Sequence, residues 1–228
     1  MVYPIYVRRS QVRGQAGDLA NIASRKQRIM ETGFQLFSEQ GIESITMKTI
    51  AEKSGVPWTS MHRCFAAKVD LVIAIGAWKW DEYIAEYRTV FDQEKTAHMS
   101  AAEHLKWYLD AFLDLYRNHR DILRFNYAFN SYLRNEKATE EQEQPYLHEI
   151  ELLREAFHRL YEKGLKDGTI NRNISEEEMF SSSFHIMLAV VTRCAVGLVY
   201  VPPELEASPE RELERLKAMM LREYTVCL

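Results

Sequence analysis

The side chains best suited to chemistry stand close together around Ser60. Arg63 follows Ser60 by three residues and Thr59 by four, so the three share one face of a helix and present small or cationic hydrogen-bond donors. Met61 and Phe65 are four residues apart and form an apolar back. A short helix with these two faces is suited to reading base edges in the DNA major groove, where an arginine can contact a guanine through two hydrogen bonds.

A second pattern, Glu155 and His158, has the Glu-x-x-His spacing of di-iron helix bundles. Those sites need the motif twice and two further glutamates. Glu94 and His98 do not supply it, because they are four residues apart. We expect no metal site and no cofactor, and the sequence contains no nucleotide-binding glycine loop and no Gly-x-Ser-x-Gly motif. An enzyme is therefore not predicted.

The three cysteines lie far apart and none forms a Cys-x-x-Cys pair, which argues against disulfides and zinc and favours a reducing, cytoplasmic compartment. The N-terminus does not resemble a secretory signal, because its arginines follow the apolar patch. No run of apolar residues is long enough for a membrane span, so we expect no membrane association. The cysteines are Cys64, Cys194 and Cys227.

The residues before Ser60 position the polar face. Met47, Ile50 and Ala51 make one face of a preceding helix apolar. Gly55 stands where that helix must end with a positive φ, and Pro57 suits the first turn of the next helix. Two short helices joined by a tight glycine turn predict a helix-turn-helix.

The rest of the chain is also helical in pattern, so we expect an all-α protein. The predicted domains are a basic N-terminal arm at 1–23, a helix-turn-helix domain at 24–70 and a larger helical domain at 71–228. The segment 135–144 is polar and is expected to be a loop. About nine helices are predicted; besides the two short ones they cover 24–41, 68–93, 100–118, 121–133, 145–164, 175–197 and 209–225.

Charge is unevenly distributed along the chain. The net charge is −4, yet residues 1–71 hold ten lysines and arginines against six acidic residues, a net +4, and the remainder holds nineteen against twenty-seven, a net −8. Ordinary scatter can give such a split. A basic head on an acidic body is also what a DNA-binding protein needs, because phosphate neutralisation supplies much of the affinity.

Residues 28–71 resemble the DNA-binding domain of TetR-type transcriptional regulators, without a gap. The sequence departs from the usual family pattern at Pro57, Thr59 and His62, where the family commonly has Ser, Gly and Tyr, so an unusual operator sequence is expected. The matching positions are Ile29, Gly33, Leu36, Phe37, Gly41, Thr46, Ile50, Ala51, Gly55, Val56, Phe65, Lys68 and Leu71.

The resemblance implies a ligand-responsive regulator, most simply a repressor that a small molecule releases from a palindromic double-stranded DNA operator. The alternative is a helical small-molecule-binding protein or enzyme whose helix-turn-helix no longer binds DNA. Arg63 could instead contact a phosphate, and Trp58 could pack beside Met61. By position, the resemblance implies DNA contacts by Thr46, Lys48, Trp58, Thr59, Ser60, His62, Arg63 and Lys68.

The resemblance further implies a homodimer and a pocket for a largely apolar effector in the second domain. Each residue proposed for these roles could equally belong to the core, and the polar ones could lie on the surface. The candidate dimer residues are Phe184, Met187, Leu188, Val191, Leu213, Leu216 and Met220. The candidate ligand residues are Trp107, Tyr108, Phe112, Asn126, Tyr127, Asn130, His158 and His185, and we expect His158 and His185 to lie in apolar surroundings.

Overall fold

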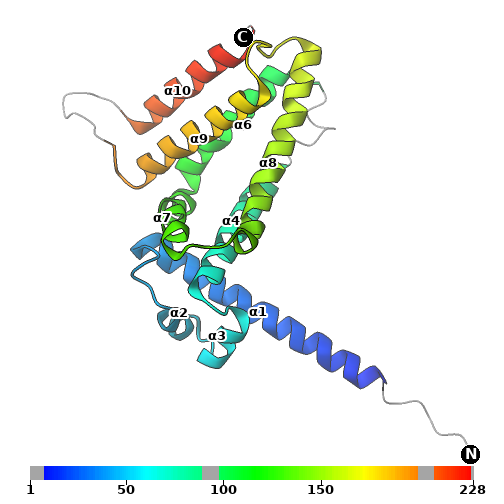
Figure 1. The fold of residues 1–228 in the computed structure, drawn as a ribbon, viewed down its shortest axis with the longest axis vertical. Coiled ribbons are helices and arrows are strands. Elements are labelled where there is room, and N and C mark those ends of the chain that lie inside the picture. Colours follow the sequence, from blue (N-terminus) through cyan, green and yellow to red (C-terminus); the bar gives the residue numbers. More distant parts are fainter. Residues whose placement is uncertain (1–7, 89–97, 200–207, 227–228) are drawn as a thin grey trace, which may run out of the picture. The chain divides into compact units, whose positions relative to one another are not determined.

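The structure is a computed structural model that describes residues 8–88, 98–199 and 208–226, with side chains for 20–86, 98–199 and 208–226. Over these residues it contains nine α-helices and no strand apart from one isolated bridge (Figure 1), which confirms the prediction of an all-α fold with about nine helices. The chain divides into two compact units, Met1–Ile75 and Gly76–Leu228. None of the described helices is both long and apolar enough to cross a membrane.

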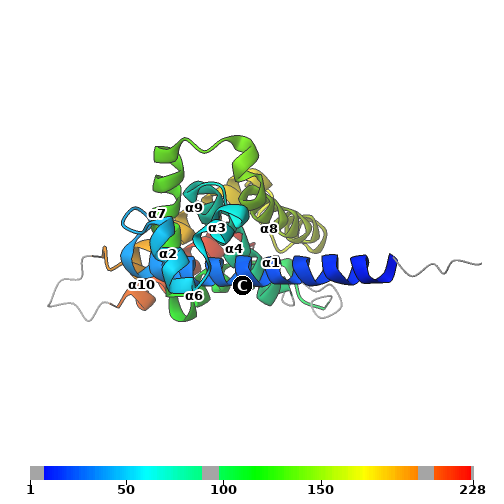
Figure 2. The same ribbon diagram turned by 90° about the horizontal axis from the view of Figure 1, so that it is seen from below.

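Unit 1 consists of α1 (Arg8–Gln40), α2 (Met47–Ser54), α3 (Trp58–Cys64) and the start of α4 (Lys68–Arg88). Figures 1 and 2 show α2 and α3 together on one side of α1. Fully or almost fully buried apolar side chains from all four helices form the core. They include Ile29, Phe37, Ile50, Met61 and Leu71.

The predicted start of the first helix, Ser24, is wrong, because α1 begins at Arg8. Periodicity reveals a helix only where one face is buried, and the described side chains of 20–26 are exposed. The added segment contains no proline, so nothing in it prevents the helix from extending. Helix propensity alone is a weak signal, so without an apolar pattern the sequence does not predict the helix before Ser24.

Unit 2 contains the remainder of α4, then α6 (Ala101–Asn118), α7 (Arg120–Glu136), α8 (Glu140–Asp167), α9 (Glu176–Ala195) and α10 (Pro209–Tyr224). Helix α6 packs against α7, α8, α9 and α10, so it is the central helix of this unit (Figure 1). Its buried residues, including Leu105, Leu109 and Leu113, recur every fourth position along one face.

The loop predicted at 135–144 is wrong in its second half, because α8 begins at Glu140. Thr139 caps the helix: its hydroxyl accepts from the Gln142 N–H, and the Gln142 side chain accepts from the Thr139 N–H. Pro145 lies inside the first two turns of the helix, where its missing N–H removes a single intrahelical hydrogen bond. The capping box therefore outweighs the proline as the start signal.

The turn after α8 caps the start of α6. An Asp167 carboxylate oxygen accepts from the Ala101 N–H at 2.8 Å, and the Thr169 hydroxyl accepts from the Ala102 N–H at 3.1 Å. These backbone donors have no partner within their own helix. The N-terminus of α6 is thus capped by a turn that lies more than sixty residues further along the chain.

The same turn is hydrogen-bonded to the end of α10. The Asn171 N–H donates to the Tyr224 carbonyl at 2.8 Å, and the Val226 N–H donates to the Thr169 carbonyl at 3.0 Å. Ile170, fully buried, forms the isolated bridge with Thr225. The two segments, 169–171 and 224–226, form a C-terminal clasp that ties the end of α10 to the turn that follows α8.

A group of charges joins α6 to α10. The Lys217 ammonium lies 2.6 Å from an Asp110 carboxylate oxygen and 2.5 Å from one of Glu214. Hydrogen bonds from Lys217 lower the pKa of Glu214. At Asp110 burial acts in the opposite direction, but the hydrogen bonds from Lys106 and Lys217 prevail and lower its pKa as well. Lys217 is mostly buried, so this group is less screened than an exposed ion pair.

Candidate nucleic-acid interface and ligand cavity

Helices α2 and α3 are fixed by local signals. The Thr46 hydroxyl caps α2 by accepting from the Thr49 N–H at 3.1 Å. Gly55 ends α2 with φ of 65°, a conformation that favours glycine, and the following Val56 N–H donates to the Ala51 carbonyl at 3.1 Å. The buried Met61 then anchors α3 from its inner face.

The outer face of α3 is polar and open in unit 1. Thr59, His62 and Arg63 are exposed, and Ser60 is half-buried. Trp58 is 46% exposed and meets the His62 ring edge-on, with ring centroids 4.3 Å apart. Trp58 therefore lies on the outer face of α3, with His62, whereas Met61 lies on the inner face.

The remaining predicted DNA contacts, Thr46, Lys48 and Lys68, lie outside α3 and in different environments. Thr46 and Lys48 are exposed at the start of α2. The Lys68 ammonium lies 5.9 Å from the centre of the Phe37 ring, and its side chain is half-buried. The first turn of α2 contains no acidic residue, so no carboxylate neutralises the positive end of the helix dipole there.

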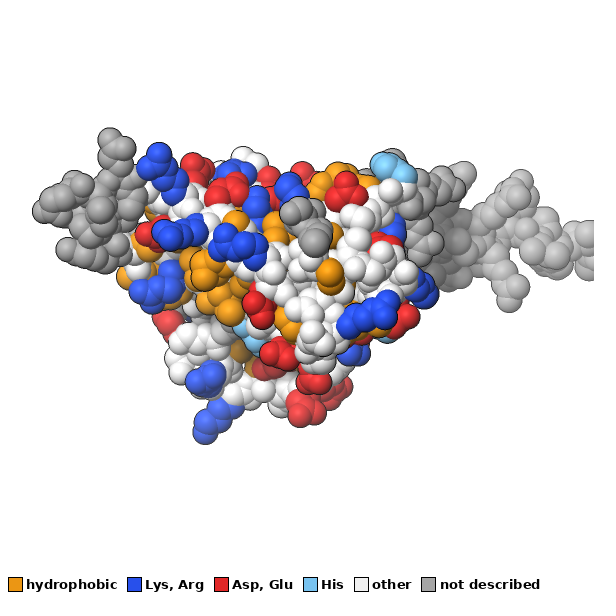
Figure 3. Space-filling model, turned by 90° about the horizontal axis from the view of Figure 1, so that it is seen from above, with side chains coloured by type: hydrophobic (Ala, Val, Ile, Leu, Met, Phe, Trp, Pro, Cys, Tyr) orange, Lys and Arg blue, Asp and Glu red, His pale blue; other side chains and the backbone are white. Residues whose placement is uncertain are grey.

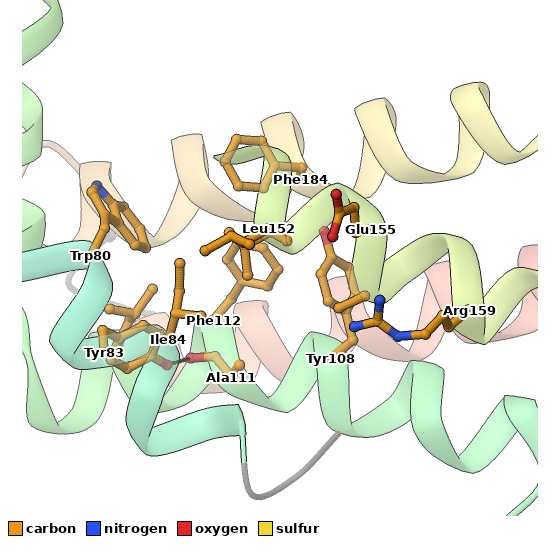
Figure 4. A pocket seen from close by; sticks show the side chains of 13 residues that line it. Trp80, Tyr83, Ile84, Tyr108, Ala111, Phe112, Leu152, Glu155, Arg159 and Phe184 are labelled. Carbon is orange, nitrogen blue, oxygen red and sulfur yellow. Dashed lines mark hydrogen bonds between the residues drawn. The ribbon is translucent and has the colours of Figure 1, made fainter. Parts of the chain in front are cut away.

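Unit 2 encloses a cavity of about 320 Å³ between α4, α6, α8 and α9 (Figure 4). Its wall is mostly aromatic and aliphatic, and this size is at the small end of the range for small-molecule sites. The lining residues are Trp80, Tyr83 and Ile84 from α4; Tyr108, Ala111, Phe112 and Leu115 from α6; Leu152, Leu153, Glu155, Ala156 and Arg159 from α8; and Phe184 from α9.

Two tyrosine hydroxyls of the cavity wall differ in their hydrogen bonding. The Tyr83 hydroxyl donates to the Ala111 carbonyl at 2.5 Å. The Tyr108 hydroxyl is inaccessible to water and has no hydrogen-bond partner among the described residues. Burial raises the pKa of Tyr108, so the hydroxyl stays protonated and remains a donor. An unpartnered buried hydroxyl costs free energy until a ligand pairs with it.

Of the eight predicted ligand residues, the cavity includes two, Tyr108 and Phe112. Trp107, Tyr127 and Asn130 are exposed away from it, and Asn126 is buried with its carbonyl oxygen unpaired in the described structure. The expectation of apolar surroundings for His158 and His185 is wrong, because both side chains are exposed. His158 Nδ1 instead lies 2.8 Å from a Glu176 carboxylate oxygen.

Sequence reasoning missed the contribution of α4 to the cavity. Trp80, Tyr83 and Ile84 follow the three- and four-residue spacing of a helix face, which was the available signal. That spacing equally describes a helix that packs into a closed core. Only the three-dimensional arrangement of four helices shows which apolar side chains leave a space between them.

Five of the seven residues predicted for the dimer interface are buried within the subunit itself. Phe184, Met187, Val191, Leu213 and Met220 belong to the core of unit 2, since helix periodicity does not distinguish one buried face from another. Leu188 and Leu216 are half-buried. The large apolar side chains exposed on α9 and α10 are instead Ile186 and Met219. The face shown in Figure 3 has hydrophobic side chains gathered among lysines and arginines.

Residues 29–75 match the family model for bacterial regulatory proteins of the tetR family. An HTH-type transcriptional regulator of Staphylococcus aureus, strain MRSA252, is 33% identical over 109 residues, which are 48% of this chain and 57% of that protein. A second regulator, from strain USA300, is 32% identical over 109 residues, again 48% of this chain and 57% of that protein. The match thus spans little more than half the length of these relatives.

Solved structures share the fold over most of the chain. A Saccharomonospora viridis protein in complex with choline has a TM-score of 0.68 at 14% identity, covering 90% of this chain and 100% of that one. The regulator FadR of Bacillus subtilis in complex with stearoyl-CoA has a TM-score of 0.64 at 14% identity, covering 86% and 97%. At such identities these similarities establish the fold alone.

Proposed function

We propose, from the match of residues 29–75 to the tetR family of bacterial regulatory proteins, that this chain is a cytoplasmic, dimeric repressor released from DNA by a small molecule. The observation that carries the proposal is the outer face of α3. Thr59, His62 and Arg63 are exposed on this face, whereas Met61 on the inner face is buried. A helix presented in this way is the reading element of a helix-turn-helix.

In the proposed complex α3 enters the major groove. Arg63 donates two hydrogen bonds to a guanine, and Ser60 and Thr59 contact neighbouring base edges. Thr46, at the start of α2, and Lys48 bind phosphates, which fix the register of the helix without reading sequence. Their contacts make binding strongly salt-dependent.

The effector would occupy the cavity of unit 2. Helix α4 runs without interruption from Lys68 to Arg88, and three of its residues, Trp80, Tyr83 and Ile84, line that cavity. A ligand that displaces this part of α4 acts on the same helix that begins at Lys68, next to the DNA-reading elements in sequence. Ligand binding that favours one position of α4 over another would shift the protein away from its DNA-bound state.

A palindromic operator requires two copies of the reading helix related by a two-fold axis. We propose that α9 and α10 form the contact between copies, with the exposed Ile186 and Met219 in place of the buried residues named from the sequence. Such a contact would be self-complementary, with the same surface used by both copies.

The proposal is tested by footprinting the purified protein on genomic DNA. A protected palindrome is expected, and Arg63→Ala should lower the affinity for it by about tenfold or more through the loss of one base contact. Lys53→Ala serves as a matched control, because it removes an exposed cation from the last turn of α2 and leaves every side chain of α3 in place. Failure to protect any sequence at low salt would leave the non-DNA-binding alternative.

A further inference from the structure

The two ends of the cavity in unit 2 differ in chemistry. Figure 4 shows Trp80, Tyr83 and Ile84 at one end, and Tyr108, Glu155 and Arg159 gathered at the other. The first end offers apolar surface and aromatic rings, and its one hydroxyl, that of Tyr83, is already bonded to the Ala111 carbonyl. The second offers a buried hydroxyl and two charged side chains. A ligand that fills the cavity must therefore be apolar at one end and polar at the other.

A second, polar hollow adjoins the polar end. Glu155 and Arg159 line both spaces, and the second is completed by residues of α8 and α9 that include Arg154, His158 and Glu176. The side chains of Glu155 and Arg159 are exposed, so this end of the cavity reaches solvent. A polar head group at this end could remain partly hydrated while the rest of the ligand is enclosed.

Among the basic side chains around these two spaces, Arg154 and His158 have acidic partners and Arg159 does not. Arg154 lies 2.6 Å from a Glu151 carboxylate oxygen, and its guanidinium also interacts with Glu155 and Glu176. His158 is hydrogen-bonded to Glu176. Arg159 forms no ion pair or hydrogen bond with any residue in the described ranges. It is therefore the cation at the cavity mouth that remains available to a ligand.

We infer that the cavity binds a small amphiphile with a carboxylate head, an inference that rests on the proposed role of the cavity as the effector site. Tyr108, 95% buried and without a partner in the described structure, donates one hydrogen bond to the carboxylate. The Arg159 guanidinium, whose planar donors match a carboxylate, supplies the charge. The apolar body packs against Trp80 and Phe112.

A cationic head fits the same polar end less well. Glu155 and the aromatic walls could attract a quaternary ammonium group. Such a group has no hydrogen-bond acceptor, so it would leave the Tyr108 hydroxyl unpaired, and it would lie beside the unpaired Arg159 cation. A carboxylate satisfies both of these groups at once.

The test is calorimetric titration of the full chain with three probes that share an eight-carbon chain: octanoate, 1-octanol and octyltrimethylammonium. Octanoate should bind most tightly. Arg159→Gln should weaken octanoate by about tenfold or more, and Tyr108→Phe by about threefold to tenfold, because charge-assisted hydrogen bonds are lost. Binding of 1-octanol to Arg159→Gln should stay within about twofold of the parent protein, since no charge is involved.

Lys166→Gln is the matched control, because it removes an exposed cation from α8 that lines neither space. It should leave octanoate binding unchanged, and thermal unfolding should show that all variants fold. Equal or tighter binding of octyltrimethylammonium, an unchanged octanoate affinity in Arg159→Gln, or no binding of any probe would overturn the inference. Because these titrations contain no DNA, their outcome is separate from whether an operator exists.

Discussion

Two tyrosines in the wall of one cavity should respond to the same substitution with opposite signs. Tyr83 and Tyr108 are 6% and 5% exposed, so phenylalanine keeps each ring buried. The Tyr83 hydroxyl is bonded to Ala111, and losing that bond should lower the free energy of unfolding by about 0.5–1.5 kcal/mol. The Tyr108 hydroxyl has no described partner, so removing it should raise the free energy of unfolding by about 1–2 kcal/mol.

Thermal unfolding without ligand measures this difference. For a chain of this length about 1 kcal/mol corresponds to about 2–4 °C, so Tyr108→Phe should melt about 2–8 °C above the parent protein and Tyr83→Phe about 1–6 °C below it. A lower melting temperature for Tyr108→Phe would refute the reasoning. It would mean that the hydroxyl is paired in solution, and Ser183, whose hydroxyl influences the pKa of Tyr108, would be its partner.

Substitutions at three further positions test the local structure. Thr46→Ala should lower the free energy of unfolding of unit 1 by about 1 kcal/mol through loss of the α2 cap, and Thr46→Ser should restore it, as measured by urea unfolding followed by circular dichroism. Gly55→Ala should cost about 1 kcal/mol in the same assay, because φ is 65° and no atom lies near the added methyl group; an unchanged midpoint would contradict the left-handed cap. The pKa values of Asp110 and Glu214 are lowered below their ordinary 3.8 and 4.5, so their contribution to stability is present above those values and is lost as the pH falls through the lowered ones. Lys217→Met should therefore show a smaller drop in melting temperature between about pH 6 and about pH 3 than the parent protein, and an equal drop would show that Lys217 does not stabilise these carboxylates.

The DNA-reading unit could be predicted from the sequence because each of its signals is local. Thr46 as a cap, Gly55 as a positive-φ stop and the Met61–Phe65 apolar spacing each act within a few residues. Ser208 followed by Pro209 likewise marked the start of α10. Such signals depend on backbone geometry that neighbouring residues fix by themselves.

Unit 2 was less predictable, because its site depends on how distant helices meet. Apolar spacing identified α9 and α10, yet it could not tell that Met187 and Leu213 face their own core. His158 and His185 were placed among apolar residues by their sequence neighbours, but both side chains point to the surface. The role of Arg159 follows from its lack of an ion pair or hydrogen bond in the described structure, which depends on the positions of side chains from several helices and cannot be inferred from residue spacing.

The C-terminal clasp has a practical consequence for handling this protein. The backbone at 224–226 is hydrogen-bonded to the turn that also caps the start of α6. A shortened C-terminus should therefore loosen the N-terminal turn of α6, the central helix of unit 2. An affinity tag for purification is therefore better fused before Met1 than after Leu228, and a deletion series that removes Thr225 should yield aggregated material.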